Sequence, residues 1–190
     1  MKTGVLALQG AFREHRETLE SLGVAVAEVR TPEQLGTVDA LVIPGGESTT
    51  MHHLLMSSGL VDPLTDAIAE GLPVLGTCAG LIMLAREVLD GRPDQRPLGA
   101  IDITVRRNAY GRQRDSFEAD LHISGLEGPV FRGVFIRAPA IERVGDAVAV
   151  LAEHNGRPVL ASEGRVWVTT FHPELAGDCR VHERFLEEVA

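Results

Sequence analysis

Cys78 lies at the centre of the stretch GTCAG, where a strand-like run of residues gives way to a helix-like one. A Gly-x-nucleophile-x-Gly turn between a strand and a helix strains the backbone of the nucleophile, and Gly76 and Gly80 leave room for neighbouring backbone. The N-terminus of the following helix favours a thiolate, because its N–H groups and its dipole stabilise negative charge. Free cysteines are most often small buried residues, so a catalytic interpretation requires a base nearby.

His172 is the histidine with the clearest catalytic setting. It directly follows the strand-like run RVWVTTF, and Glu174 comes two residues later in the sequence HPE. Pro173 favours extended backbone at His172, and in extended backbone residues two apart point to the same side. The Glu174 carboxylate is therefore expected to orient the imidazole. Cys78, His172 and Glu174 would form a triad in which the thiolate attacks, the imidazole moves the proton and the carboxylate supports the imidazolium.

The remaining histidines have simpler interpretations. Those that fall on predicted helices with polar neighbours are expected at or near the surface: His15, His52, His53 and His182. His122 is expected at a strand end, and His154 precedes Asn155-Gly156, a strong signal for a hairpin turn.

A second glycine turn follows another strand-like run, in the sequence VIPGGEST. Gly45 and Gly46 end the strand, and Ser48 or Thr49 is expected to cap the next helix. The simplest interpretation is a tight turn with an N-cap. In a cysteine acyl-transfer enzyme, however, the tetrahedral intermediate needs main-chain N–H donors that no side chain obstructs, and glycines supply them.

The elements that would position these turns alternate between strand and helix. Strand-like runs are expected at 3–10, 24–30, 38–46 and 72–76. Helical patterns are expected at 13–23, from Thr31-Pro32, at 48–59, 62–71 and 79–89. This alternation predicts right-handed βαβ units and a parallel sheet, which binds ligands at the carboxyl ends of its strands. Both glycine turns and a loop LQGA after the first strand lie at that edge.

The second half of the chain has a different pattern. A loop rich in proline, glycine and charge spans 91–99, and six short strand-like runs follow before a final helix at 181–189. They suggest antiparallel hairpins added to the sheet. The sequence therefore predicts one α/β domain, residues 1–190, with three layers, a mostly parallel central sheet flanked by helices, and added antiparallel strands.

Composition excludes several classes of protein. The formal net charge of -9 disfavours nucleic acid as a partner. Two cysteines a hundred residues apart form neither a disulfide framework nor a metal site, so Cys179 is expected to be structural or incidental, and a reducing cytoplasmic location is expected. The apolar run at the N-terminus is too short for a signal peptide or a membrane span.

In this order, GTCAG, PGGE and HPE resemble the triad, class I-type glutamine amidotransferases, whose fold is flavodoxin-like. Seven segments over essentially the whole chain resemble one branch, the glutaminase subunits of pyridoxal 5'-phosphate synthase: LALQGAFREH, PGGESTTM, GTCAGLI, RNAYGRQRDSFEADL, GVFIRAP, EHNGRPV and FHPEL. The resemblance implies hydrolysis of L-glutamine to L-glutamate and ammonia, with no cofactor and no metal. The loop Asp90 to Pro97 is somewhat long and arginine-rich for this branch.

The resemblance also assigns residues to roles. Cys78 is the implied nucleophile, and His172 and Glu174 complete the triad. The implied glutamine contacts are Gly46, Glu47, Ser48, Arg107, Ile136 and Arg137, where arginine suits the substrate α-carboxylate. The main-chain N–H groups of Gly46 and Ala79 are the implied oxyanion donors, and Gln9 is expected near this hole and the partner interface. As ordinary alternatives, Arg107 is a solvated strand-end charge and Arg137 an ion-pair partner.

The resemblance implies a partner as well. This partner is a synthase subunit with a TIM-barrel fold, which combines the ammonia with ribose 5-phosphate and glyceraldehyde 3-phosphate. The family assembles twelve synthase and twelve glutaminase subunits. The free glutaminase is expected to be poorly active, because the partner completes the oxyanion turn.

Three alternatives remain open from the sequence. A glutaminase serving another pathway, such as histidine, anthranilate or guanylate synthesis, would share the triad and the strained GTCAG turn around the cysteine, called the elbow below. A DJ-1-like cysteine hydrolase or chaperone would commonly carry histidine after the cysteine, where this chain has Ala79, and would leave HPE unexplained. A non-catalytic interaction module would leave all three turns without a cause.

Overall fold

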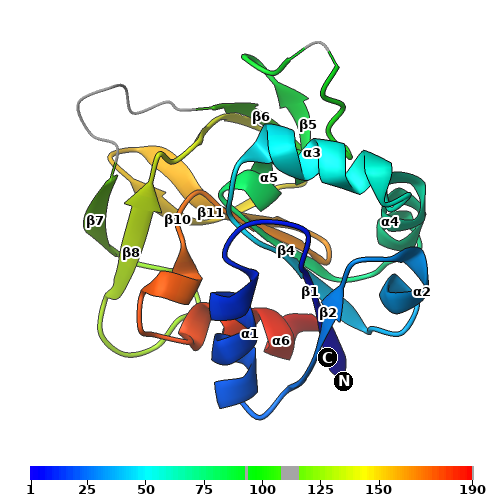
Figure 1. Ribbon diagram of the computed structural model, residues 1–190. Helices are drawn as coiled ribbons and strands as arrows, with labels where there is room; N and C mark the ends of the chain where they lie inside the picture. The colour runs from blue at the N-terminus through cyan, green and yellow to red at the C-terminus, as the bar shows by residue number, and fades with distance from the viewer. Residues whose placement is uncertain (93, 108–115, 190) are drawn as a thin grey trace.

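The computed structural model describes residues 1–92, 94–107 and 116–189, and these residues form three layers around a seven-stranded sheet (Figure 1). The strand order is β10-β11-β12-β4-β3-β1-β2. The parallel strands are β1 (Lys2–Leu6), β2 (Ala25–Val29), β3 (Ala40–Ile43), β4 (Val74–Thr77) and β12 (Val166–Thr169). Two antiparallel strands extend the sheet beyond β12, namely β11 (Arg157–Glu163) and β10 (Ala149–His154).

Helices cover both faces of this sheet. One face packs against α2 (Pro32–Leu35), α3 (Ser48–Ser57), α4 (Val61–Ala69) and α5 (Ala79–Leu84). The other face packs against α1 (Phe12–Ser21) and α6 (Arg180–Val189), which lie next to each other in Figure 1. Alternation along β3 builds both cores, because Leu41 and Ile43 belong to the first and Ala40 and Val42 to the second. The predicted α/β fold with a mostly parallel sheet is confirmed.

The sequence pattern suggested that the added strands join the central sheet. Several of them form two separate small sheets instead. A small sheet contains β5 (Ala85–Val88), β6 (Ile101–Arg106) and β9 (Ala140–Val144). A separate hairpin contains β7 (Ser116–Leu121) and β8 (Phe131–Ile136). Among the described strands, β10 and β11 extend the main sheet as antiparallel strands, and the turn between them is at Asn155-Gly156, where both residues have positive φ. The last of the six runs, RVWVTTF, forms β12 and pairs in parallel with β4, which corrects the expectation of an antiparallel strand there.

The predicted helix 79–89 is wrong in its second half. It ends at Leu84, and Ala85 begins β5, which pairs in parallel with β6. The Glu87 carboxylate accepts a hydrogen bond from Thr104 of β6 at 2.8 Å. Pairing with a distant strand therefore outweighs the local preference for helix. The strand β9 was not predicted at all.

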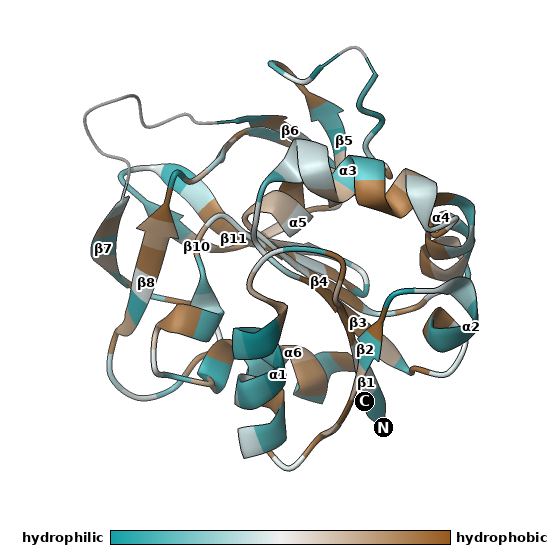
Figure 2. Ribbon diagram, viewed as in Figure 1, coloured by the Kyte–Doolittle hydropathy of each residue, from teal (hydrophilic) through white to brown (hydrophobic). Residues whose placement is uncertain are grey.

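Three of the four histidines expected at or near the surface are buried. His15 and His182 are 0% exposed and His52 is 5% exposed, whereas His53 is exposed as predicted. The error for His15 arises from α1, which is mostly hydrophilic (Figure 2), so its polar neighbours gave no indication of burial. His15 shares the inner face of α1 with Leu19, one turn further along the helix.

None of the helices in the described part of the chain has the length and apolar character needed to cross a membrane.

Candidate active site

Cys78 occupies a strained turn between β4 and α5. Its φ and ψ are 49° and −98°, a region that residues with side chains rarely adopt. Its N–H donates to the carbonyl oxygen of Thr169, at the end of β12, over 2.8 Å. A Cβ atom on Gly80 would overlap the carbonyl oxygen of Ile43, and one on Gly76 would lie 2.8 Å from the carbonyl carbon of Gly80. The two glycines thus allow the close packing that holds this turn.

His172 and Glu174 lie in the turn that follows β12. The His172 N–H donates to the carbonyl oxygen of Val134 in β8 over 2.8 Å, and its Nδ1 lies 2.7 Å from Glu174 Oε1. Since a carboxylate only accepts, Nδ1–H is the donor. The contact expected from the sequence is present, but its cause differs. Pro173–Leu175 form a 3-10 helix, η1, and this turn rather than extended backbone brings the carboxylate to the ring.

The charged form of His172 is strongly favoured. Burial disfavours the imidazolium, but hydrogen bonds with Cys78 and Glu174 outweigh it and raise the pKa of His172 to about 10. Burial also acts against the charge of Glu174. The neighbouring His15 and the hydrogen bond with His172 outweigh this effect and hold the pKa of Glu174 below its usual range. At neutral pH the site therefore contains a carboxylate and an imidazolium next to the Cys78 sulfur.

The Gly45-Gly46 turn lies against these residues. A Cβ on Gly45 would meet the His172 ring and would lie 3.3 Å from Cys78 Cβ, so only glycine fits here. The loop after β1 holds the turn from the other side. The Ala11 N–H donates to the Gly45 carbonyl oxygen over 3.0 Å, and the Glu47 N–H donates to Gln9 Oε1 over 3.0 Å.

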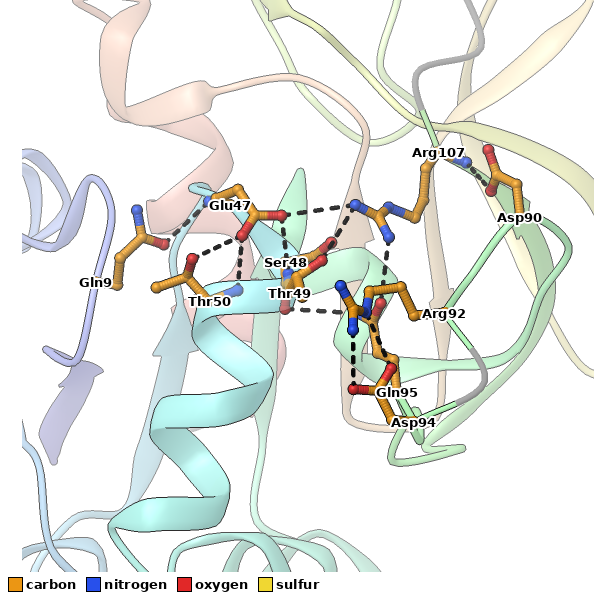
Figure 3. A network of polar contacts seen from close by, with 10 residues as sticks. All are labelled: Gln9, Glu47, Ser48, Thr49, Thr50, Asp90, Arg92, Asp94, Gln95 and Arg107. Atoms are coloured by element: carbon orange, nitrogen blue, oxygen red, sulfur yellow. Dashed lines mark hydrogen bonds and ion pairs between the residues drawn. The ribbon is translucent and has the colours of Figure 1, made fainter.

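Glu47 caps α3, which corrects the prediction that Ser48 or Thr49 would do so. Its carboxylate accepts hydrogen bonds from the N–H groups of Thr49, at 3.0 Å, and Thr50, at 2.7 Å (Figure 3). Partial burial of the carboxylate acts in the opposite direction, but these bonds and the Thr50 hydroxyl lower the pKa of Glu47 to about 2. The helix start predicted at Thr31-Pro32 is confirmed, and there Thr31 caps α2 through its side chain.

Arg107 directly follows β6, and its side chain reaches the same helix terminus. Its guanidinium lies 3.6 Å from Glu47 Oε1 and donates to Thr49 Oγ1 and Gln95 Oε1, each at 3.3 Å (Figure 3). Its main-chain N–H donates to Asp90 over 2.7 Å. Gln95 and Asp90 come from the arginine-rich loop, so part of this loop positions Arg107. The sequence contained no signal for these contacts, because no local pattern links the segments.

A cavity of about 260 Å³ brings most of the predicted site residues together. It is lined by Gln9, Gly46, Glu47, Ser48, Cys78, Ile82, Arg107, Ile136, Arg137 and His172. The carbonyl oxygen of Ile136 lies 3.9 Å from the Cys78 sulfur. Ala79 and Glu174 are buried and do not line the cavity, whereas Ile82, which no sequence motif indicated, does.

Arg137 shares one property with Cys78. Its φ is 44°, so the cavity carries two side chains on left-handed backbone. No group of three or more His, Cys, Asp or Glu side chains in the described ranges could hold a metal ion. Residues 108–115 of the motif RNAYGRQRDSFEADL, and residue 93 of the loop Asp90 to Pro97, lie outside the described residues.

Comparison with known proteins identifies the family. The chain is 58% identical to the pyridoxal 5'-phosphate synthase subunit PdxT of Mycobacteroides abscessus, over 98% of this chain and 96% of that one. It is 55% identical to the PdxT protein of Herpetosiphon aurantiacus, over 98% and 99% of the two chains. The specific resemblance predicted from the sequence is thereby confirmed.

Solved structures agree with this assignment. A crystal structure of a glutamine amidotransferase matches with a TM-score of 0.93 and 49% identity, over 98% of each chain. PurLQS from Thermotoga maritima matches over 100% of this chain and 99% of that one, with a TM-score of 0.74 but only 16% identity, so it supports the fold alone. The model of the SNO glutamine amidotransferase family matches residues 5–190, and the chain belongs to this family.

Proposed function

We propose that Cys78, His172 and Glu174 are the residues with which this glutamine amidotransferase hydrolyses the side-chain amide of L-glutamine. The ammonia is delivered to the synthase subunit of pyridoxal 5'-phosphate synthase. One observation carries the proposal. A cysteine on a strained elbow, a histidine with a carboxylate partner at 2.7 Å and a glycine turn meet at one cavity.

The first half of the reaction releases ammonia. The Cys78 sulfur attacks the amide carbon of glutamine, forms a C–S bond and moves the carbonyl electrons onto oxygen. The imidazolium of His172 then donates its proton to the leaving nitrogen, and the C–N bond breaks. The products of this half are free ammonia and a thioester between Cys78 and the glutamyl group. Glu174 holds Nδ1–H throughout, which keeps Nε2 directed at the reacting atoms.

The second half regenerates the enzyme. Neutral His172 accepts a proton from water, and the resulting hydroxide attacks the thioester carbon. The C–S bond breaks, L-glutamate leaves, and the thiolate and imidazolium are restored. Each step thus uses the same imidazole in alternating protonation states.

The main-chain N–H groups of Gly46 and Ala79 are the proposed oxyanion donors. Ala79 is the first residue of α5, where a helix leaves its N–H groups unpaired. Gly46 lies in the turn beside His172, and the loop containing Gln9 holds this turn. Donors fixed before the reaction stabilise negative charge without reorganisation.

The cavity also contains groups suited to the rest of the substrate. We assign the α-carboxylate of glutamine to Arg107 and Arg137, because guanidinium groups bind carboxylates through paired hydrogen bonds. Glu47 and Ser48 line the same cavity, and Glu47 is the group suited to the α-ammonium. Ile136 offers its main-chain carbonyl and an apolar contact next to the sulfur.

The partner is proposed from the family. We expect a synthase subunit with a TIM-barrel fold, which uses ribose 5-phosphate and glyceraldehyde 3-phosphate, in a complex of twelve synthase and twelve glutaminase subunits. The two free cysteines fit a reducing compartment, which supports a cytoplasmic location. Glutaminases of other pathways and DJ-1-like hydrolases are not favoured, since relatives more than 50% identical over nearly the full chain are pyridoxal 5'-phosphate synthase subunits.

The partner assignment is tested by measuring glutamate formation with and without the purified synthase subunit. We expect slow turnover of the free chain and a rise of at least tenfold in kcat when the synthase is added in equal amount. The control is an unrelated TIM-barrel enzyme at the same concentration. Activation by a different acceptor subunit, and none by the synthase, would contradict the pathway and leave the hydrolytic chemistry intact.

Glu174→Gln is expected to shift the pH dependence of activity. The His172 pKa of about 10 keeps the imidazolium intact well into the alkaline range, and Glu174 contributes through a hydrogen bond and its charge. A neutral amide removes that charge, so the His172 pKa falls towards its ordinary value and the alkaline limb of kcat/KM moves to lower pH. The check is a kcat/KM profile from pH 6 to 11. An unmoved alkaline limb would show that Glu174 does not support the imidazolium.

A further inference from the structure

Two buried histidines lie close to Glu174 of the triad and do not line the cavity. His15 on α1 and His182 on α6 are both fully buried. His15 Nε2 lies 3.3 Å from Glu174 Oε2 and 3.1 Å from Thr77 Oγ1. His15 Nδ1 lies 2.9 Å from His182 Nε2. A continuous line of polar side chains therefore runs from α6 through α1 to the carboxylate that holds His172.

The protonation states in this line follow from the acceptor at its end. Glu174 is ionised and can only accept, so we place the proton of His15 on Nε2, which lies 3.3 Å from Oε2 and makes its hydrogen bond with Thr77 Oγ1. His15 Nδ1 then carries a lone pair and accepts from Nε2–H of His182. The opposite tautomer of His15 would point a lone pair at a carboxylate and a proton at His182. Each histidine thus fixes the tautomer of the next.

The charges around His15 support this assignment. Burial lowers the pKa of His15 and of His182, that of His182 to about 3, so both rings are neutral. The charged groups that act on His15 are Glu174, His172 and Glu14 of its own helix. Glu174 Oε2 is buried and, within the described residues, has no hydrogen-bond partner, and His15 Nε2 lies 3.3 Å from it.

We propose that His15 is a positioning residue of the glutaminase, which acts through Glu174, and that His182 sets the tautomer His15 needs. Glu174 has two oxygens. Oε1 lies 2.7 Å from His172 Nδ1 and Oε2 lies 3.3 Å from His15 Nε2, so each oxygen of the carboxylate has a histidine beside it. Without His15, the carboxylate can rotate about its last bond and lose alignment with Nδ1–H of His172.

The same histidine also contacts the strand that carries the nucleophile. Thr77 is the last residue of β4 and directly precedes Cys78. His15 Nε2 lies close to both Thr77 Oγ1 and Glu174 Oε2. A single ring therefore contacts both the elbow and the HPE turn. These two segments lie about a hundred residues apart in the chain, so no local interaction can align them.

A matched pair of amides tests the proposal. In His15→Gln the amide nitrogen takes the place of Nε2 and keeps a donor towards Glu174, whereas in His15→Asn it takes the place of Nδ1 and leaves Glu174 without one. We expect kcat for glutamine to fall about 10- to 100-fold in His15→Asn, the range for a lost hydrogen bond to a charged group. His15→Gln should retain most of kcat, and KM should change less than about twofold in both.

The pH profile separates positioning from packing. Because Glu174 acts on the charge of His172, the alkaline limb of kcat/KM should move to lower pH in His15→Asn, in the same direction as in Glu174→Gln, and stay in place in His15→Gln. His53→Gln, a change on the exposed face of α3, serves as the histidine control. Equal losses of kcat in the two His15 variants, with both profiles unmoved, would overturn the proposal.

A second pair covers the case in which His15→Asn does not fold. His182→Gln keeps a donor near Nε2 for His15, and His182→Asn does not, so only the asparagine variant should lose kcat and shift the profile. Equal behaviour of this pair would also overturn the proposal. The inference rests on the proposed function, but different results would refute each of them. Full turnover in Cys78→Ala would refute the proposed function, whereas indifference to His15 in an enzyme that Cys78→Ala inactivates would refute only the inference.

Discussion

Cys78→Ala is expected to abolish glutamate formation in the synthase complex, with a loss on the order of 10⁶-fold in kcat, because no thioester can form without the sulfur. Fold and docking should be unaffected, since alanine is smaller and the turn is held by main-chain contacts such as Cys78 N–H to Thr169 O. The measurement is glutamate release with saturating glutamine and excess synthase. Binding of glutamine is measured in parallel by calorimetry, and it should persist.

Two further cysteine variants make this test specific. Cys78→Ser keeps the shape of the side chain but replaces the thiol with a much weaker acid, so it should be nearly as inactive as alanine. Cys179→Ser should keep full activity, because Cys179 does not line the cavity. Activity retained in Cys78→Ala, or lost in Cys179→Ser, would contradict the assignment of the nucleophile.

Gly45→Ala is expected to lower kcat by about 100-fold, the effect of displacing a catalytic group by roughly 1 Å. The new Cβ would lie 2.9 Å from His172 Nδ1 and even closer to Cε1, so the ring must move away from its bond with Glu174. The φ of Gly45 is not in the left-handed region, so the expected effect is steric and not a backbone strain. Steady-state kcat and the rate of Cys78 alkylation by iodoacetamide should both fall.

Gly36→Ala is the matched control for this substitution. Gly36 ends α2 with φ −66°, and a Cβ there would meet its nearest atoms at 3.7 and 3.8 Å, which is ordinary contact. Its kcat should equal that of the wild type. If Gly45→Ala also kept kcat within about twofold of the wild type, the close packing of the turn against His172 would have no catalytic role.

The features that the sequence predicted are those set by short-range preferences. The strand-elbow-helix around Cys78 follows from two glycines at fixed spacing, and the cap of α2 follows from Thr31 and Pro32. The parallel sheet follows from the alternation of apolar runs with helical patterns. Carboxyl ends of parallel strands meet at one edge, so the glycine turns and the HPE turn could be expected at the same place.

The errors have two causes, a strand partner from another segment and local turns that the residue pattern does not distinguish. The second half of helix 79–89 became β5 because β6 offered a strand partner. Glu47 replaced Ser48 or Thr49 as the cap of α3 because its carboxylate accepts from two N–H groups and also faces Arg107. A 3-10 helix brings Glu174 to His172 in the HPE turn. The sequence predicted extended backbone at this point instead, because of Pro173.

By itself, the sequence determined the chemistry of this protein and its family, because reactive residue types and glycine positions are local features. Only the tertiary structure decided what surrounds them. His15 and His182 are 167 residues apart and lie on helices with largely polar sequences, yet they meet beneath Glu174. Helical spacing can indicate the buried face of each helix, but the hydrogen-bond partners depend on which faces the packed layers bring together, and no single helix contains that information.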